Sequence, residues 1–358
     1  MGNLMNERNQ MSSLYSKYQG FLTPAAKILV GDSDRDLVES SGAQVENLSV
    51  SLSLDTTASA SFSLINVYDF EKSSFMNSVM DQLQLGNRIK IELGYGSSLE
   101  KVFTGFIYSV KADFGDMASL SVTALDVRRV MEDAMRRSVV WKYTTYSDIF
   151  RKVMEPYKKL YSKLIVDDTP ANEVVSMMQN ESDLTFVKRL AKEGNREFFV
   201  YDDIVYFRRK AKRSPSVTLT WGQDLISFTK ESIYSNQKVI VMGLLKDSKD
   251  TVTASAEVKT DSSTKQVAAG GLVYDVVSPT SDTQQKAAEK AARLAEEMRK
   301  KKQSGQGSCT GLPQLLPGRP VAVAGLSSQI NGTYMLKNVT HNFGGDGFQT
   351  QFEIGGFD

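Results

Sequence analysis

The C-terminal end of the chain contains three short runs of alternating side chains, separated by turn residues. Residues 320–326 alternate between larger and smaller side chains, and a Pro317-Gly318 break precedes them. A second run at 334–339 follows a turn at Asn331-Gly332, and a third run at 348–354 follows a glycine-rich turn. Alternation with a period of two indicates strands with one buried face, and Asn-Gly readily adopts the positive φ angles of a hairpin. The pattern predicts an antiparallel meander, typical of a small barrel or sandwich.

A longer strand-rich block lies nearer the N-terminus. Glycines 31, 42, 96 and 115 mark turns between its runs, and residues 70–85 predict a short helix. The predicted strands alternate in polarity or are rich in Val, Ile, Phe and Tyr, and they span 27–30, 44–54, 59–66, 88–95, 100–112 and 118–126. We therefore expect an N-terminal segment at 1–25 and a first antiparallel β-barrel domain at 26–140.

The spacing of apolar residues changes to a helical period between 141 and 212. Ser147 is predicted to cap one helix that ends near Pro156, and Ser182 a second helix that ends at Gly194. Residues 197–201 and 204–208, joined by an Asp-Asp turn, are expected to form a hairpin. These elements predict a small α/β insert domain at 141–212.

A second barrel domain is expected at 213–358. Its predicted strands include 217–221, 226–234 and 238–245, in addition to the C-terminal meander. Residues 251–281 are polar and rich in Ser, Thr, Ala and Gly, which predicts an extended excursion or a mobile loop. Residues 282–303 carry a narrow apolar stripe with helical spacing, and 304–307 are expected to end that helix. The expected fold class is mainly β, with two antiparallel β-barrels flanking an α+β insert and a long helix near the second barrel.

The balance of charges argues against nucleic-acid binding. The 358 residues include 43 basic and 42 acidic ones, which gives a net charge of +1. No apolar run approaches the ~20 residues that span a bilayer, and residues 1–20 lack the apolar centre of a cleavable signal. We therefore expect synthesis in the cytoplasm and no membrane insertion by the chain itself.

Few residues are suited to catalysis or metal binding. The single cysteine, Cys309, is expected to be inert beside a predicted strand, and the single histidine, His341, to be structural rather than a ligand or a base. Two pairs of adjacent aspartates occur, at 167–168 and 202–203. Glycoside hydrolysis needs two carboxyl groups ~5–10 Å apart. Adjacent carboxylates are more often solvated turn residues, and we expect that here. The basic run 299–302 fits either an anionic partner or a solvated helix end. No catalytic residue, metal or cofactor is predicted.

Three segments, in order, resemble the phage late control D family, the baseplate hub proteins of contractile phage tails and related contractile injection systems. The middle segment resembles the family's Ser-x-x-x-Phe-x-x-x-Leu-Ala-x-Glu-Gly core, with matches at Ser182, Phe186, Leu190, Ala191, Glu193 and Gly194. The start of the second barrel matches at Trp221 and Gly222. The C-terminal segment, with Leu316 as an extra residue, matches at Gly311, Pro313, Leu315, Pro317, Gly318, Val321, Val323, Gly332, Tyr334, His341, Thr350 and Phe352.

The resemblance implies a structural role rather than an enzymatic one. Hub proteins of this family form homotrimers whose two barrels per chain make a pseudo-hexameric ring, which adapts a threefold spike to the sixfold tail tube. The implied partners are a tail tube protein, other baseplate proteins and a separate spike protein, because the chain ends at Asp358 without the β-helix of VgrG-type spikes. The alternative interpretation is a cell-wall-degrading enzyme or a glycan-binding module of a tail.

Overall fold

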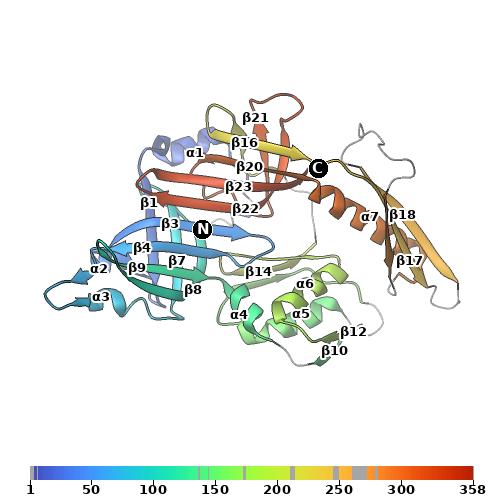
Figure 1. Cartoon of the computed structure of the whole chain (residues 1–358), viewed down its shortest axis with the longest axis horizontal. Helices are drawn as coiled ribbons and strands as arrows, with labels where there is room; N and C mark the ends of the chain where they lie inside the picture. The colour runs from blue at the N-terminus through green and yellow to red at the C-terminus, as the bar shows by residue number, and fades with distance from the viewer. Residues whose placement is uncertain are drawn as a thin grey trace.

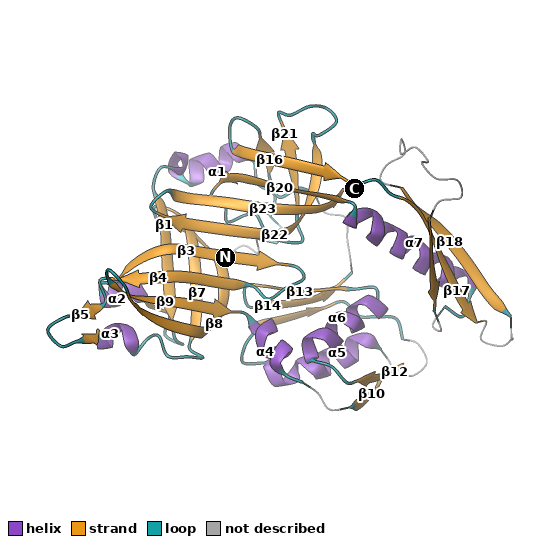
Figure 2. Cartoon of the chain, viewed as in Figure 1, coloured by secondary structure: helices purple, strands orange, loops and turns teal. Residues whose placement is uncertain are grey.

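The computed structural model describes residues 4–5, 7–135, 138–143, 145–171, 175–209, 214–244, 250–259, 272–278 and 281–357 (Figure 1). The chain is mainly β with a few helices, which confirms the predicted fold class (Figure 2). The helices are α1 Met11–Lys17, α2 Leu37–Ser41, α3 Asn77–Met80, α4 Val127–Asp133, α5 Tyr146–Met154, α6 Asp183–Glu193 and α7 Gln284–Lys301, with 3-10 turns η1 Gln19–Phe21 and η2 Glu155–Tyr157.

The first strand-rich block forms a strongly bent antiparallel sheet. All six predicted strands are present, as β1 Pro24–Val30, β3 Gln44–Ser53, β4 Ser59–Ile65, β7 Arg88–Tyr95, β8 Ser98–Phe114 and β9 Ala118–Leu125. Shorter strands are β2 Arg35–Asp36, β5 Tyr68–Asp69 and β6 Ser74–Phe75. The hydrogen-bonded order is β3-β4-β9-β8-β7-β1, with β2 paired to β1. Alternate residues of these strands are buried, as expected for strands with one face on a core.

The second strand-rich block has the same strand order as the first. Its strands are β15 Thr218–Thr220, β16 Leu225–Ser232, β20 Gln303–Thr310, β21 Pro320–Ala324, β22 Gly332–Gly344 and β23 Gly347–Phe357. They are hydrogen-bonded in the order β16-β20-β23-β22-β21-β15, so each strand has a counterpart in the same place along the chain in the first block. One difference is that β15 is parallel to β21, whereas β1 is antiparallel to β7. The predicted C-terminal meander is confirmed.

Local irregularities repeat along with the topology. β8 shifts register against β9 between Ile107 and Ser109, and β22 shifts against β23 between Leu336 and Asn338. Gly86 donates its N–H to the Ile107 carbonyl oxygen at 2.8 Å, and Gly318 donates to the Leu336 carbonyl oxygen at the same distance. Both glycines have positive φ, +89° and +79°, a conformation that glycine adopts at little cost. Because bulges and positive-φ glycines recur at corresponding positions, the two blocks are structural repeats.

The two repeats share a single sheet. β3 of the first block pairs with β22 of the second through residues 48–53 and 338–343. Figure 1 shows the strands from β16 through β22 and β3 to β8 following one another in one layer. The largest buried apolar cluster draws side chains from both blocks. The two predicted barrels are therefore joined edge to edge by backbone hydrogen bonds.

The insert forms its own small core beneath the first block. Its strands are β10 Val139–Tyr143, β11 Lys163–Val166, β12 Val175–Gln179, β13 Glu197–Tyr201 and β14 Ile204–Arg208. Helix α6 and the β13–β14 hairpin agree with the sequence prediction. The predicted cap of the first helix is wrong: Thr145 accepts a hydrogen bond from the Asp148 N–H, whereas Ser147 lies inside α5 and bonds to Thr169. Helices α5 and α6 bury their apolar faces against the hairpin.

The segment predicted as an extended excursion or a mobile loop contains strands. β17 Asn236–Leu244, β18 Thr251–Lys259 and β19 Leu272–Val277 form a separate three-stranded sheet, ordered β18-β17-β19, and α7 packs on it. Residues 260–271 and 279–280 of the predicted loop lie outside the described residues. The described part of 251–281 is thus extended, and the sequence did not identify β18 as a strand because its buried residues, Val252, Ala254 and Val258, are small. The strand predicted at 238–245 likewise belongs to this sheet and not to the second barrel.

The long helix is confirmed, but its surroundings differ from the prediction. α7 ends at Lys301, and residues 304–307, predicted as a break, continue directly into β20. Gly305 and Gly307 were predicted to end the helix, but both lie in β20. Atoms of the neighbouring strands lie so close to them that a side chain would not fit. Cys309 lies within this strand, not beside it.

Candidate functional site

Small polar side chains cover one face of the continuous sheet. Directly paired residues share a face, and successive residues of a strand point to opposite faces. On one face the paired rows run through apolar residues such as Leu52, Val339 and Phe352, which are buried. The other face is partly or fully exposed and consists mostly of hydroxyl and amide side chains: Ser227, Thr229, Gln306, Ser308, Gln351, Glu353, Asn338, Thr340, Ser49, Ser51, Ser61, Ser63, Ser121, Thr123 and Ser109. We call this the polar face.

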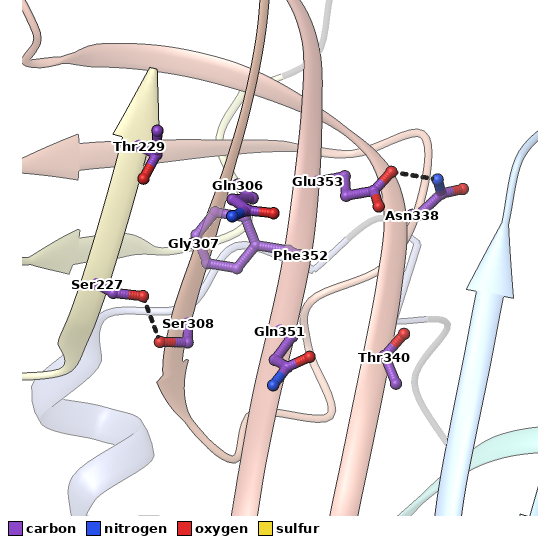
Figure 3. Close-up of a pocket in the computed structure, with 10 residues that line it drawn as sticks. All are labelled: Ser227, Thr229, Gln306, Gly307, Ser308, Asn338, Thr340, Gln351, Phe352 and Glu353. Atoms are coloured by element: carbon purple, nitrogen blue, oxygen red, sulfur yellow. Dashed lines mark hydrogen bonds between the residues drawn. The ribbon is translucent and has the colours of Figure 1, made fainter. Parts of the chain in front are cut away.

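The polar face is hollowed over the second block. A depression of about 300 Å³ lies over β16, β20, β23 and β22. Figure 3 shows Ser227 directed toward Ser308, with 2.6 Å between their hydroxyl oxygens, and the Asn338 amide donating to the Glu353 carboxylate at 2.6 Å. Most of its lining side chains are uncharged, and Glu353 is the one carboxylate among them. The hollow therefore presents hydrogen-bonding groups with little charge.

Side chains as well as backbone join the two repeats across the seam. The Ser49 hydroxyl donates to Asn342 Oδ1 at 2.9 Å, and the hydroxyls of Ser51 and Thr340 are 3.3 Å apart. The sequence prediction did not identify these residues as partners. The alternation of serine at 49, 51 and 53 and again at 59, 61 and 63 is the signal that marks the polar face.

Charged groups fix the insert hairpin to the first block. Lys101 Nζ lies 2.6 Å from Asp202 Oδ2, and Arg88 Nη2 lies 2.7 Å from Asp203 Oδ2. Thr104 also donates a hydrogen bond to Asp202. The expectation that this Asp-Asp pair is solvated is wrong, because the hairpin turn packs on β7 and β8 and both carboxylates are largely buried.

Burial governs the titration of this ionic cluster. It raises the pKa of Asp202 above its usual range, and the charge of Asp203 adds to that shift, although Lys101 and Thr104 oppose it. Burial alone would lower the pKa of Lys101, but the two aspartates outweigh it and the pKa is raised. The other predicted acidic pair, Asp167-Asp168, is exposed as expected. The buried pair is engaged with cations and is arranged as a structural contact.

His341 and Cys309 are buried in the second block. His341 Nδ1 lies 2.9 Å from the Thr350 hydroxyl, and burial lowers the pKa of the imidazole to about 3, with the backbone of Leu315 acting in the opposite direction. Burial also raises the pKa of the Cys309 thiol. Both side chains are therefore uncharged at neutral pH. Across the described residues no group of three or more His, Cys, Asp and Glu is placed to hold a metal ion, and no helix there is long and apolar enough to cross a bilayer.

The motif residues of the insert occupy structural positions. Ser182 caps α6 by accepting a hydrogen bond from the Thr185 N–H at 3.2 Å. Phe186, Leu190 and Ala191 are buried in the insert core. Glu193 is exposed at the last position of the helix, and the Gly194 N–H bonds to the Leu190 carbonyl at 2.8 Å to close it. The structure brings these residues together in a single capped helix.

The C-terminal motif forms a buried turn that leads into β21. All residues from 311 to 320 are buried, Pro313, Pro317 and Gly318 among them. A Cβ at Gly311 would lie 2.2 Å from the Phe348 ring, so only glycine fits there. Tyr334 and Phe352 are buried in the core. In contrast, Gly332 is exposed at the start of β22, and Trp221 and Gly222 are exposed in the turn before β16.

Solved structures with this fold include tail proteins. The tail protein from Neisseria meningitidis MC58 has a TM-score of 0.68 at 15% identity, over 93% of this chain and 97% of that one. The 43 kDa tail protein of prophage MuSo2 from Shewanella oneidensis has a TM-score of 0.69 at 13% identity, over 93% and 98%. A chain of the half-lidded Francisella PdpA-VgrG complex has a TM-score of 0.58 at 9% identity, over 96% of this chain and 60% of that one. The chain therefore has the fold of phage tail proteins.

The sequence also matches a family model. Residues 36–344 match the Alg8 N-terminal domain, and the chain belongs to that family. The match covers most of both repeats and the whole insert. No curated protein matches the sequence.

Proposed function

We propose that this protein is a structural baseplate hub of a contractile tail or injection particle. Three chains, each with two repeats, would form a pseudo-hexameric ring that adapts a threefold spike to a sixfold tail tube. The observation that carries the proposal is the duplicated strand order, because three copies of two like blocks supply six similar units. The tail-protein fold and the resemblance to the late control D family support it.

All four parts of the chain would act together as one adaptor. These parts are the segment 1–25, the barrels at 26–140 and 213–358, and the insert at 141–212. One ring face would meet the tube protein, and the opposite face, with parts of the insert, would meet the spike and other baseplate proteins. The polar face suits the lining of a central passage, because its hydroxyl and amide groups remain hydrated without holding a charged cargo. We propose no nucleic-acid binding and no membrane insertion.

We further propose that the role is not enzymatic. The aspartates at 202 and 203, which the sequence offers as a carboxylate pair, are occupied by Lys101 and Arg88. A cell-wall-degrading role makes a different prediction. Zymography on purified cell walls would show clearing that disappears when one carboxylate is changed.

The oligomeric state tests the proposal directly. Mass photometry of the full chain, mixed with the tube and spike proteins of its own gene cluster, is expected to give particles that contain three copies. Electron microscopy of those particles is expected to show six similar lobes around an axis. Particles that contain only dimers or tetramers of this chain would contradict the hub.

A further inference from the structure

The second block binds a short piece of the N-terminal segment in a groove beside the start of β21. Arg319, which is only 2% exposed, donates hydrogen bonds to the carbonyl oxygens of Leu4 and Glu7. The N–H of Asn9 donates to the Ser216 carbonyl oxygen at 2.8 Å. All three bonds reach the backbone of the segment, which is neither helix nor strand at these residues. This groove therefore holds a non-helical peptide mainly by its backbone.

The first block contains a counterpart of each backbone bond that shapes this groove. Asn87 holds the place of Arg319, because each follows the positive-φ glycine of its repeat and accepts an N–H from the bulge. Gly31 holds the place of Ser216, because the N–H of each donates at 2.8 Å to the residue that begins β7 or β21. The bonds are Ile107 N–H to Asn87 and Gly31 N–H to Arg88 in the first block, and Leu336 N–H to Arg319 and Ser216 N–H to Pro320 in the second.

The groove of the first block is open. A depression of about 270 Å³ lies between the first block and the insert. Gly31, Asn87 and Arg88 line it from the first block, and Lys159 and Leu160 line it from the insert. These residues are partly or largely exposed, whereas their counterparts in the second block are buried under the N-terminal segment. Within the described part of the chain, no segment covers the first-block groove as residues 4–9 cover the other.

The number of grooves and segments indicates the source of the occupant. Each chain has two grooves of this kind and one N-terminal segment, which its own second block binds. A second copy of the chain has its segment engaged in the same way. The groove of the first block therefore fits a segment of a different protein.

The charges along the open groove indicate which side chain that segment carries. Arg88 and Lys159 line the groove, together with one carboxylate, that of Asp32. Arg88 contacts Asp203 through Nη2 at 2.7 Å, and a guanidinium has five N–H donors, so it can also reach an oxygen in the groove. Arginine and lysine form their strongest hydrogen bonds with carboxylates. An acidic residue in the segment would therefore be favoured.

Two further features match the groove of the second block. The Gly31 carbonyl oxygen accepts a long hydrogen bond from the Asp34 N–H, at 3.3 Å, and its second lone pair can accept a peptide N–H as Ser216 does. Leu160 is 38% exposed at the edge of the groove. An apolar side chain can cover it, as Leu4 is buried in the second block.

We propose that the first-block groove binds a short, non-helical segment of a different protein, with an acidic residue close to an apolar one. The acidic side chain contacts Lys159 and Arg88, the apolar side chain covers Leu160, and a backbone N–H donates to the Gly31 carbonyl oxygen. The binding mode is that of a peptide held by its backbone, with two side-chain contacts for specificity. The groove lies within one chain, so the site does not depend on the ring proposed above.

A peptide array tests the proposal. The labelled full chain is applied to overlapping short peptides from the other proteins of its gene cluster. At least one peptide with neighbouring acidic and apolar residues is expected to bind, and fluorescence anisotropy then gives its affinity in solution. Lys159→Glu is expected to weaken binding roughly tenfold, because attraction to the acidic residue becomes repulsion. Lys158→Glu is the matched control, since Lys158 is also exposed but does not line the groove.

Two more measurements separate the outcomes. Leu160→Glu is also expected to weaken binding roughly tenfold, and hydrogen exchange is expected to slow in the flanking segments 31–34 and 158–160 when the peptide binds. Equal affinities of the Lys158→Glu and Lys159→Glu variants, protection elsewhere in the chain, or an array without a binding peptide would each overturn the proposal. Tighter binding of a synthetic peptide with the sequence of residues 3–10 would assign the groove to a second copy and overturn it as well.

Discussion

The aromatic ring of Phe352 lies across the backbone of Gly307 on the neighbouring strand. A Cβ at position 307 would be 2.5 Å from Phe352 Cζ and 3.0 Å from the Ser227 carbonyl oxygen. The approach to the ring is closer than real Cβ contacts allow, so the buried Phe352 ring would have to shift, while the Ser227 backbone on the other side leaves the new methyl group little room. Position 307 therefore has no room for a side chain beside this ring.

Gly307→Ala is expected to destabilise the second block by about 1–3 kcal/mol, because the added methyl group overpacks the core. Urea unfolding monitored by circular dichroism measures the change. Gly345→Ala is the matched control, since no atom lies within 4 Å of a Cβ there. Combining Gly307→Ala with Phe352→Leu is expected to recover part of the loss. Equal stability of the two glycine variants would contradict this account.

Arg128→Met is expected to cost about 3–5 kcal/mol, because it leaves the Asp126 carboxylate buried without its cation. Arg128 is only 1% exposed, its Nη2 lies 2.6 Å from Asp126 Oδ2, and it also donates to the Ser53 carbonyl. Thermal unfolding of the full chain measures the loss. Arg129→Met is the control: its ion pairs with Glu132 and Asp133 involve half-exposed carboxylates and should contribute far less.

Lys101→Met is expected to destabilise the contact between the insert and the first block by about 1–3 kcal/mol, because Asp202 then loses its nearest charged partner. Adding Asp202→Asn is expected to restore part of the stability, since the buried charge is removed as well. Limited proteolysis at the hairpin, with unfolding by urea, reports on the contact. A double variant less stable than Lys101→Met alone would argue against this ionic arrangement.

The free energy of unfolding is expected to decrease as the pH falls from 6.5 toward 3, because of His341. His341 has a pKa near 3 in the folded chain against 6.5 for a free imidazole, so the unfolded state takes up a proton first. The contribution of the neutral imidazole is complete above pH 6.5 and is lost as pH falls toward 3. Between pH 7 and 4.5, the free energy of unfolding of the native chain should decrease by about 2–3 kcal/mol more than that of the His341→Gln variant. Parallel pH profiles would be inconsistent with a buried neutral histidine.

Strand and helix positions followed directly from the sequence where local chemistry is strong. Alternation, or a high content of β-branched and aromatic residues, marked the six longer strands of the first block, and Ser182 with Gly194 marked both ends of α6. These signals are local, because a cap or an alternating strand needs only a few neighbouring residues. The weak strand β18 was missed because its buried residues are small.

The mainly β composition, the two strand-rich blocks and the insert between them can be derived from the sequence alone, because alternation and helical spacing are local patterns. Which strand edges meet depends on contacts between distant parts of the chain. The pairing of Ser51 with Thr340 and of Lys101 with Asp202 joins residues far apart in the chain, and no local pattern encodes such contacts. The sequence did not reveal the repeat for the same reason. Equivalent strands of the two blocks share their place in the sheet and their bulges, although their side chains differ.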